Sequence, residues 1–294
     1  MRSPSSQTTT PAAVSRMLGD LKDPEKVKAW VRRNQQNLKA WAAFLAVVFV
    51  LFVLFSDGDF SFVMTLGSLI SMFAFLMVAV QIETSKSCSG VSLKMYECYV
   101  VVLSARLCSI VPFEGYLPYD RSGDWLYQTV EAISLLLAGT IVFMCRRRFA
   151  STYDPTTDTL NHLWLIFPAL VLSLIFHPSL NAWMPADIAW TFALYLESFS
   201  CLPQLFLFQR EGKVQPFTTH FLAGQALSKF LSFIFWFSSY SELNDPTKGL
   251  KSYVGIWVIV MQFLQLIVMG DFIWHYLRCI SKGVPVAFIL NDEV

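Results

Sequence analysis

The chain has 294 residues, of which 55% are hydrophobic and 15% are charged, with a formal net charge of +1. Its mean hydropathy is +0.50. A soluble domain carries about 25% charged residues, so the composition excludes an ordinary soluble protein and indicates a membrane protein.

Apolar runs predict the membrane spans. Hydrocarbon about 30 Å thick needs about 20 mainly apolar residues per helix. The first and fifth candidate runs are short, and the third contains Glu97 and Arg106, so the pattern alone fits seven or eight spans. The candidates are residues 40–55, 61–81, 94–113, 125–145, 163–177, 187–208, 218–239 and 253–277.

A polar stretch of about 39 residues precedes the first apolar run, and no cleavable signal peptide is evident in it. The segment from Ser3 to Ser15 is rich in Ser, Thr and Pro and predicts disorder. From Pro24 onward the spacing predicts a basic amphipathic helix, because Val27, Trp30 and Val31 recur on one side. Such a helix can lie on an anionic leaflet or continue as a solvated helix into the first span.

Lys and Arg in the short loops predict the orientation. With eight spans, one side collects most of these residues, whereas the other holds only Arg121, Lys248 and Lys251. Both termini are therefore expected in the cytosol, and an even number of spans keeps the bias consistent.

Several ionisable residues lie deep inside these apolar runs. A charge near the bilayer centre costs about 2.5–3.5 kcal/mol, so such residues normally face a polar cavity. The pattern predicts an internal, charged binding site. The residues are Arg106, Asp187, Glu197 and Lys229.

A weak internal repeat relates two of these charges. Arg106 lies 14 residues beyond Ser92, and Lys229 lies 11 residues beyond Thr218, each after a polar turn. At 1.5 Å rise per residue both cations fall near the membrane midplane. Parallel repeats with a site between them at mid-depth are a common transporter plan.

The sixth span carries an acidic and aromatic face. Asp187, Trp190 and Glu197 lie at i, i+3 and i+10 and so share one helix face. Pro203 is expected to kink the helix and free a carbonyl, to which Gln204 can hydrogen-bond. Glu197 can serve a ligand, or it can form an internal ion pair that holds the bundle together.

Longer motifs resemble the ER lumen protein-retaining receptor family, the KDEL receptors, over about residues 61–282. The extra first span and the basic N-terminal segment resemble the longer, plant-type branch of that family. The motifs are Ser87-Cys-Ser-Gly-Val-Ser92, Ala105-Arg106, Ala150-Ser-Thr-Tyr-Asp154, Trp190-Thr-Phe-Ala-Leu-Tyr-Leu-Glu-Ser198, Leu202-Pro-Gln-Leu-Phe206 and Phe217-Thr-Thr-His220.

The resemblance implies an all-α integral membrane protein. Its fold would be a seven-helix PQ-loop/SWEET-like core of two three-helix bundles plus one extra N-terminal transmembrane helix. The expected domains are a cytosolic disordered and basic amphipathic segment (1–39), the extra transmembrane helix (40–56), the seven-helix receptor domain (61–282) and a cytosolic tail (283–294).

Site residues carry over from the family by position. Arg106 matches an arginine of the peptide site, Trp190 and Trp236 match its tryptophans, and Glu197 matches an acid. Asp187 stands where the family has glutamate, and Lys229 where classical receptors have arginine. Asp271 matches an aspartate used in retrograde sorting.

Departures from the family also fall at the site. Ser71 stands in place of the histidine linked to pH-dependent binding, and Ser109 in place of an acid beside the first arginine. The tail lacks the paired lysines that recruit the retrieval coat. Other departures are Met64 and Ser239 at arginine positions, and Leu107, Ser228 and Ser232 at tyrosine positions.

The leading function is binding of C-terminal KDEL-like retention signals of ER lumenal proteins and their return from Golgi to ER. The alternatives are a PQ-loop-type small-solute transporter and a scaffold without ligand binding. We expect no enzymatic activity, cofactor, metal site or nucleic-acid partner. The expected partners are the tetrapeptide, the coat machinery of retrograde vesicles and lipids of the ER and Golgi membranes.

Overall fold

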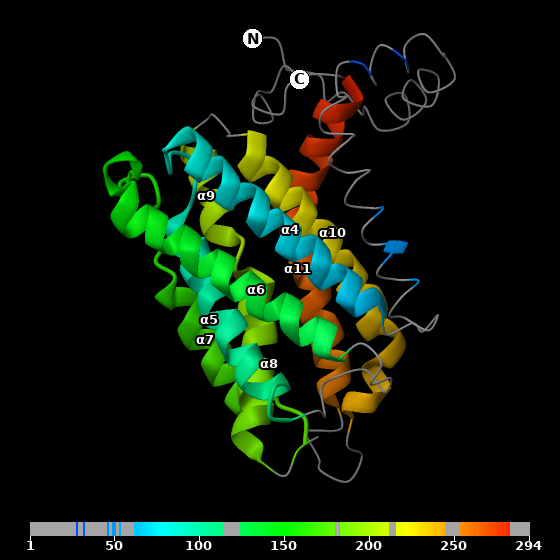
Figure 1. The fold of residues 1–294 in the computed structure, drawn as a ribbon. Coiled ribbons are helices and arrows are strands. Elements are labelled where there is room, and N and C mark those ends of the chain that lie inside the picture. The colour runs from blue at the N-terminus through cyan, green and yellow to red at the C-terminus, as the bar shows by residue number, and fades with distance from the viewer. Residues whose placement is uncertain are drawn as a thin grey trace, which may run out of the picture.

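The computed structural model describes residues 62–113, 124–179, 181, 183–211, 216–244 and 253–282, with a few isolated earlier positions. The described residues form helices and no strands (Figure 1). The α-helices are α4 (Phe62–Ser85), α5 (Leu93–Ile110), α6 (Asp124–Phe143), α7 (Leu163–Ile175), α8 (Met184–Phe199), α9 (Leu202–Glu211), α10 (Pro216–Ser239) and α11 (Val254–Lys282). Short helices η3 (Met144–Arg148), η4 (Ala150–Thr152) and η5 (Tyr240–Leu243) follow α6 and α10.

These helices agree closely with the seven spans predicted after residue 60, when α8 and α9 are counted as one span. Five helices of the described residues are long and apolar enough to cross a membrane: 62–85, 125–148, 184–211, 217–239 and 254–279. Helix α7 is apolar but has 13 residues, and α5 carries Lys94, Glu97 and Arg106 within 18 residues. Nearly all of the first predicted span and of the N-terminal amphipathic segment lies outside the described residues.

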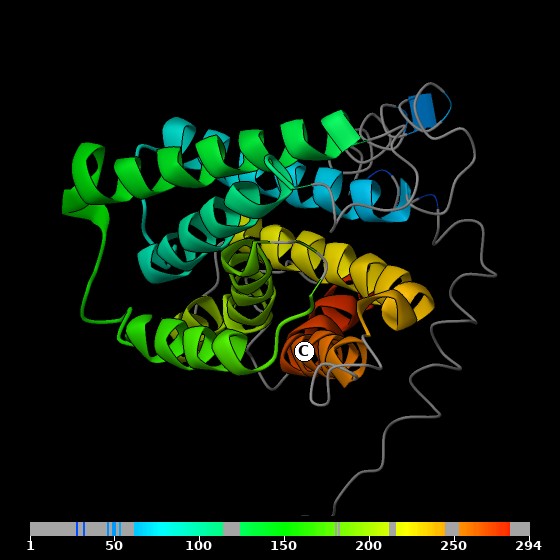
Figure 2. The same cartoon turned by 90° about the horizontal axis from the view of Figure 1, so that it is seen from below.

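The helices pack in two groups with the same internal arrangement. In the first group α6 contacts both α4 and α5, and in the second α11 contacts both α8 and α10. The groups meet where α4 packs on α10 and α5 packs on α8, while α7 packs against α8. Figure 2 shows α4, α5 and α6 as one layer over the other helices. The predicted repeat therefore has a counterpart in the helix contacts, with α5 and α10 in corresponding places.

Small residues let α4 and α10 approach closely. A Cβ atom added at Gly67 would lie 3.2 Å from the carbonyl oxygen of Ser228. One added at Gly224 would lie 3.2 Å from the Cβ atom of Ala74. Glycine at these positions brings the two backbones together, as small residues commonly do between membrane helices.

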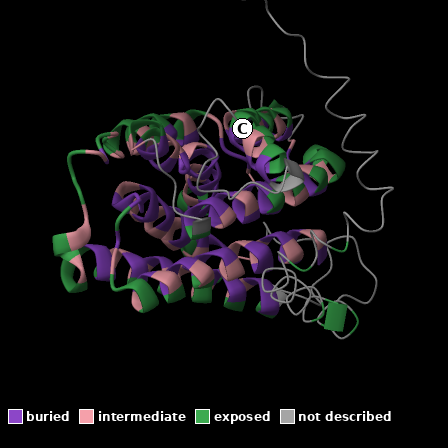
Figure 3. Cartoon of the chain, turned by 90° about the horizontal axis from the view of Figure 1, so that it is seen from above, coloured by how far each residue is buried: buried purple, intermediate pink, exposed green. Residues whose placement is uncertain are grey.

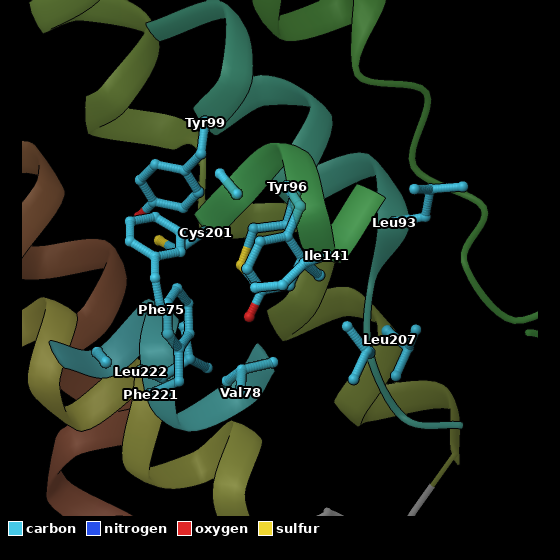
Figure 4. Close-up of a cluster of buried hydrophobic side chains, with 14 of the residues drawn as sticks. Phe75, Val78, Leu93, Tyr96, Tyr99, Ile141, Cys201, Leu207, Phe221 and Leu222 are labelled. Carbon is cyan, nitrogen blue, oxygen red and sulfur yellow. The ribbon is translucent and has the colours of Figure 1, made fainter. Parts of the chain in front are cut away.

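Aromatic side chains fill the core between the two groups (Figure 4). Phe75 of α4 lies edge-on to Tyr99 of α5, with ring centroids 5.1 Å apart. Phe221 of α10 lies 5.2 Å from Phe75 and 5.4 Å from Tyr96. These rings are almost fully buried, and such pairs add about 0.5–1.5 kcal/mol beyond the burial of their area.

The sixth predicted span is broken just before Pro203, as the proline predicts. Helix α8 ends at Phe199 and α9 begins at Leu202. The physical reason is that a proline ring clashes with the carbonyl four residues earlier, which here belongs to Phe199. Pro203 itself lies in the first turn of α9, where proline is well tolerated.

Many residues on the outward faces of the bundle are exposed (Figure 3), and large apolar side chains are common among them. Leu136 of α6, Phe167 of α7, Phe237 of α10 and Phe263 of α11 are all more than half exposed. A soluble monomer rarely exposes such contiguous apolar surface. These faces suit lipid contact, and the chain is an all-helical membrane protein.

Candidate functional site

A buried glutamate joins three helices at the centre of the bundle. Glu197 of α8 accepts hydrogen bonds from Arg106 Nη2 of α5 and from Lys229 Nζ of α10. The Lys229 Nζ to Glu197 Oε1 distance is 2.5 Å. Arg106 belongs to the first helix group, and the other two residues belong to the second. The two mid-depth cations predicted from the sequence therefore meet at one carboxylate.

A second carboxylate completes this network, and sequence reasoning missed it. Glu131 of α6 accepts a hydrogen bond from Arg106 Nη1 at 3.0 Å, and Ser68 of α4 donates to its other oxygen at 2.7 Å. Glu131 is 3% exposed. Its place in the middle of a predicted span was the same signal that singled out Glu197, so the criterion applied to the other charges would have found it.

The four charged side chains line a small cavity between the two helix groups. Its volume is about 30 Å³, which is room for about two water molecules. Cations and carboxylates are equal in number, so the cluster is electroneutral. The remaining lining is polar and aromatic: Met64, Ser68, Ser71, Tyr99, Leu103, Tyr127, Trp190, Leu194, Ser228, Ser232, Trp236 and Gln262.

Both predicted tryptophans lie at this cavity. Trp190 of α8 and Trp236 of α10 meet edge to face, with ring centroids 5.4 Å apart, and both are buried. Phe235 packs on Trp236 at 5.0 Å. The pair forms an aromatic wall beside the charges. Large apolar side chains with a few placed polar groups are typical of ligand sites.

Two predicted residues lie elsewhere. Asp187 is buried in the first turn of α8, but it does not line the cavity, and it accepts a hydrogen bond from Asn181 at 3.2 Å. Asp271 lies on the outer surface of α11 with its side chain 87% exposed, 3.7 Å from His275. Asp187 as a ligand-binding residue and Asp271 as a sorting residue stay predictions.

Four of the positions that the resemblance marks as departures from the family line the cavity: Met64, Ser71, Ser228 and Ser232. Ser71, which the resemblance places at the family's histidine position, accepts a hydrogen bond from Gln225 Nε2 at 2.9 Å. Among the residues lining the cavity there is no histidine.

A second polar cluster lies at the end of the bundle that carries Lys86, Arg146, Arg147 and Arg148, called here the basic end. Gln204 of α9 donates to the carbonyl of Gly90 at 2.9 Å and accepts from the N–H of Ser92 at 2.8 Å. Gly90 has a φ of +73°, which glycine adopts readily. Gln204 thus bonds to the backbone before α5, rather than to the carbonyl freed at the break in its own span.

Asp158 anchors the same cluster from the segment between α6 and α7. It is buried and accepts hydrogen bonds from Ser92 Oγ at 2.9 Å and from the Tyr153 hydroxyl at 2.8 Å. Burial and the charge of Asp158 raise the pKa of Tyr153, so the hydroxyl stays a donor. Ser92 also caps α5 by accepting from the N–H of Met95. This cluster fixes the start of the helix that carries Arg106.

In the part of the chain that the structure describes, no group of three or more His, Cys, Asp or Glu residues could hold a metal ion. No disulfide bond joins the cysteines of this part.

Comparison with known proteins identifies the family to which the sequence is similar. The family model described as ER lumen protein retaining receptor matches residues 87–239. ER lumen protein-retaining receptor 3 of Mus musculus is 30% identical over 219 residues, covering 74% of this chain and 93% of the mouse protein. The chain belongs to the ER lumen protein-retaining receptor family.

Other members of the family have a similar identity to this chain over a similar length. Receptor 2 of Xenopus tropicalis is 29% identical and the Drosophila melanogaster receptor 28% identical, each over 218 residues, 74% of this chain and 93% of the relative. The matched segment 87–239 runs from the turn before α5 to the end of α10. It therefore contains the four charges and both tryptophans of the cavity.

Proposed function

We propose that this protein is a receptor that binds C-terminal KDEL-like retention signals of ER lumenal proteins and returns them from the Golgi to the ER. One observation carries the proposal: in a member of this family, Arg106, Glu197 and Lys229 converge with Trp190 and Trp236 on one buried cavity. The relatives' names describe retention of ER lumen proteins.

The chemistry of the cavity suits a peptide tail. A KDEL-like tail brings a terminal carboxylate, two acidic side chains and one cationic side chain. The guanidinium of Arg106 can hold a carboxylate in its planar fork, Lys229 offers a point charge for a second anion, and Glu197 offers an anion for the cation. Gln262 lines the cavity, and its buried Oε1 atom has no hydrogen-bond partner among the described residues. A peptide N–H group can satisfy it.

The present conformation is contracted, because a cavity of about 30 Å³ does not hold a tetrapeptide. Glu197 ties α5 and α10 to α8 through its two cations. Binding is therefore expected to accompany a separation of the two helix groups.

The repeated helix contacts support a PQ-loop/SWEET-like core, to which the predicted helix at 40–56 adds one span. That addition and the basic N-terminal segment favour the plant-type branch. The charge bias of the loops supports cytosolic termini and a multi-pass protein of the ER and Golgi membranes. The exposure of Asp271 suits contact with sorting machinery.

A small-solute transporter is the second candidate. The observation that favours it is the small, electroneutral cavity, which suits a smaller or less anionic ligand than a tetrapeptide.

Two parallel measurements separate these functions. Purified protein is titrated with a panel of C-terminal tetrapeptides, and proteoliposomes are assayed for uptake of sugars and amino acids. The receptor proposal predicts saturable peptide binding without uptake. Uptake without peptide binding would favour the transporter, and neither activity would leave a scaffold that has lost its ligand.

A further inference from the structure

We propose that Glu131 is a built-in competitor for the ligand, a carboxylate of the chain that occupies the place on Arg106 where a ligand carboxylate would bind. It thereby sets how strongly the site accepts anions. This inference rests on the proposed receptor function and adds a specificity-determining residue to it.

The geometry shows why Arg106 is not open to a further carboxylate. Its Nη1 atom donates to Glu131 Oε2 at 3.0 Å, and its Nη2 atom donates to Glu197 Oε2. Both terminal nitrogens of the guanidinium are therefore engaged by carboxylates from two different helices. A ligand carboxylate that binds in the bidentate manner must replace at least one of them.

The charge balance of the cluster also disfavours simple addition of a ligand carboxylate. Arg106 and Lys229 bring two positive charges, and Glu131 and Glu197 bring two negative ones, all on side chains no more than 10% exposed. A ligand carboxylate added to this set would leave a net negative charge in a buried site. Uncompensated buried charge is strongly unfavourable, so one carboxylate of the chain has to leave the cations when the ligand arrives.

Glu131 takes part in fewer ion pairs than Glu197. Glu197 pairs with both cations, and its main-chain carbonyl accepts a hydrogen bond from Gln265 at 3.0 Å. Among the described residues Glu131 pairs with Arg106 alone, and it also accepts a hydrogen bond from the neutral hydroxyl of Ser68. Displacing Glu131 breaks one ion pair, whereas displacing Glu197 breaks two. The ligand is therefore expected to take the place of Glu131.

Replacing Glu131→Gln tests this directly. The amide has nearly the same shape and can still accept from Arg106, but the cluster gains one net positive charge. The full-length variant should bind the free-acid peptide Lys-Asp-Glu-Leu at least about tenfold more tightly than the unmodified protein, which corresponds to about 1.4 kcal/mol. Its affinity for the C-terminally amidated peptide should rise less. Unchanged binding of the free acid would overturn the inference, and so would weaker binding, which would show that Glu131 assists the ligand.

A matched pair of conservative variants guards against loss of folding. Glu131→Asp and Glu197→Asp both keep the charge and shorten the side chain by one methylene. The first withdraws the competitor and should strengthen free-acid binding, whereas the second withdraws the bridging acid and should not. Equal effects of the two variants would contradict the inference.

The outcome also separates this inference from the receptor proposal. Peptide binding by the unmodified protein, without a gain in either Glu131 variant, overturns the inference and leaves the receptor function standing. If only the Glu131 variants bind peptide, the inference is supported, and Glu131 keeps the unmodified protein closed to the ligand. If neither the unmodified protein nor any variant binds peptide, both proposals fail.

Discussion

The Nζ atom of Lys229 lies 2.5 Å from the Oε1 atom of Glu197, and both side chains are less than a tenth exposed. This contact joins α10 to α8, and the second oxygen of the same carboxylate joins α8 to Arg106 of α5. The two helix groups are thus connected through one buried acid. These contacts stabilise the closed bundle, and they engage the groups that the proposed receptor function assigns to a charged ligand.

Replacing Lys229→Met should destabilise the protein by about 3 kcal/mol or more, because removing one partner of a buried pair leaves the other charge poorly compensated. The measurement is the free energy of unfolding in detergent. Lys86→Met is the matched control, since Lys86 lies at the same 2.5 Å distance from Glu83 on exposed side chains. Exposed pairs contribute little, so the control should remain near the unmodified protein. Similar losses in both variants would show that burial of the central pair is not what matters.

Gln204 is expected to matter for stability as much as a charged residue. Gln204→Leu removes two hydrogen bonds and leaves the N–H of Ser92 and the carbonyl of Gly90 without their side-chain partner. Each unsatisfied buried group costs about 1–3 kcal/mol, so the expected loss for the two groups is about 2–6 kcal/mol. Gln209→Leu, at an exposed position of the same helix, should change stability little. A fall in melting temperature no larger than the control's would refute the structural role of Gln204.

The helix positions could be predicted well because hydrocarbon thickness fixes the length of apolar runs. The predicted spans 61–81 and 218–239 correspond to α4 at 62–85 and α10 at 216–239. The convergence of Arg106 and Lys229 could also be predicted, since both lie at the same depth on corresponding helices. The depth of a residue along a membrane helix can be predicted from the sequence, and Arg106 and Lys229 lie at the depths predicted for them.

The rest of the site could not be read from helix periodicity. Asp187 shares a helix face with Glu197 but lies ten residues away, about 15 Å along the axis, so it falls at a different depth from the cavity. The partners of these side chains on other helices could not be predicted either. Glu131 pairs with Arg106 across two helices, and Gln204 bonds to the turn before α5, contacts that only the packed bundle defines.

Peptide affinity should depend weakly on pH between about 5.4 and about 7.4. Histidine is the side chain that ordinarily titrates in this range, and the residues lining the cavity include none. Ser71, at the family's histidine position, is hydrogen-bonded to Gln225 and carries no charge. Titrations at the two pH values should give dissociation constants within about tenfold of each other. A larger change would mean that another group performs the histidine's task.

Asp271 should affect sorting without affecting binding. Its side chain is 87% exposed on α11 and lies outside the cavity lining, so Asp271→Asn should leave peptide affinity and melting temperature nearly unchanged. The expected change is in the distribution of the protein between Golgi and ER when cargo is present, followed by microscopy. A normal distribution of the variant would remove Asp271 from the sorting mechanism.

The most direct test of the receptor account compares two peptides that differ only at the C-terminus, Lys-Asp-Glu-Leu as the free acid and as the amide. If Arg106 binds the terminal carboxylate, loss of that charge forfeits a buried ion pair worth about 3–5 kcal/mol. The free acid should then bind at least about a hundredfold more tightly, and Arg106→Ala should abolish the difference. Equal affinity of the unmodified protein for acid and amide would contradict the account.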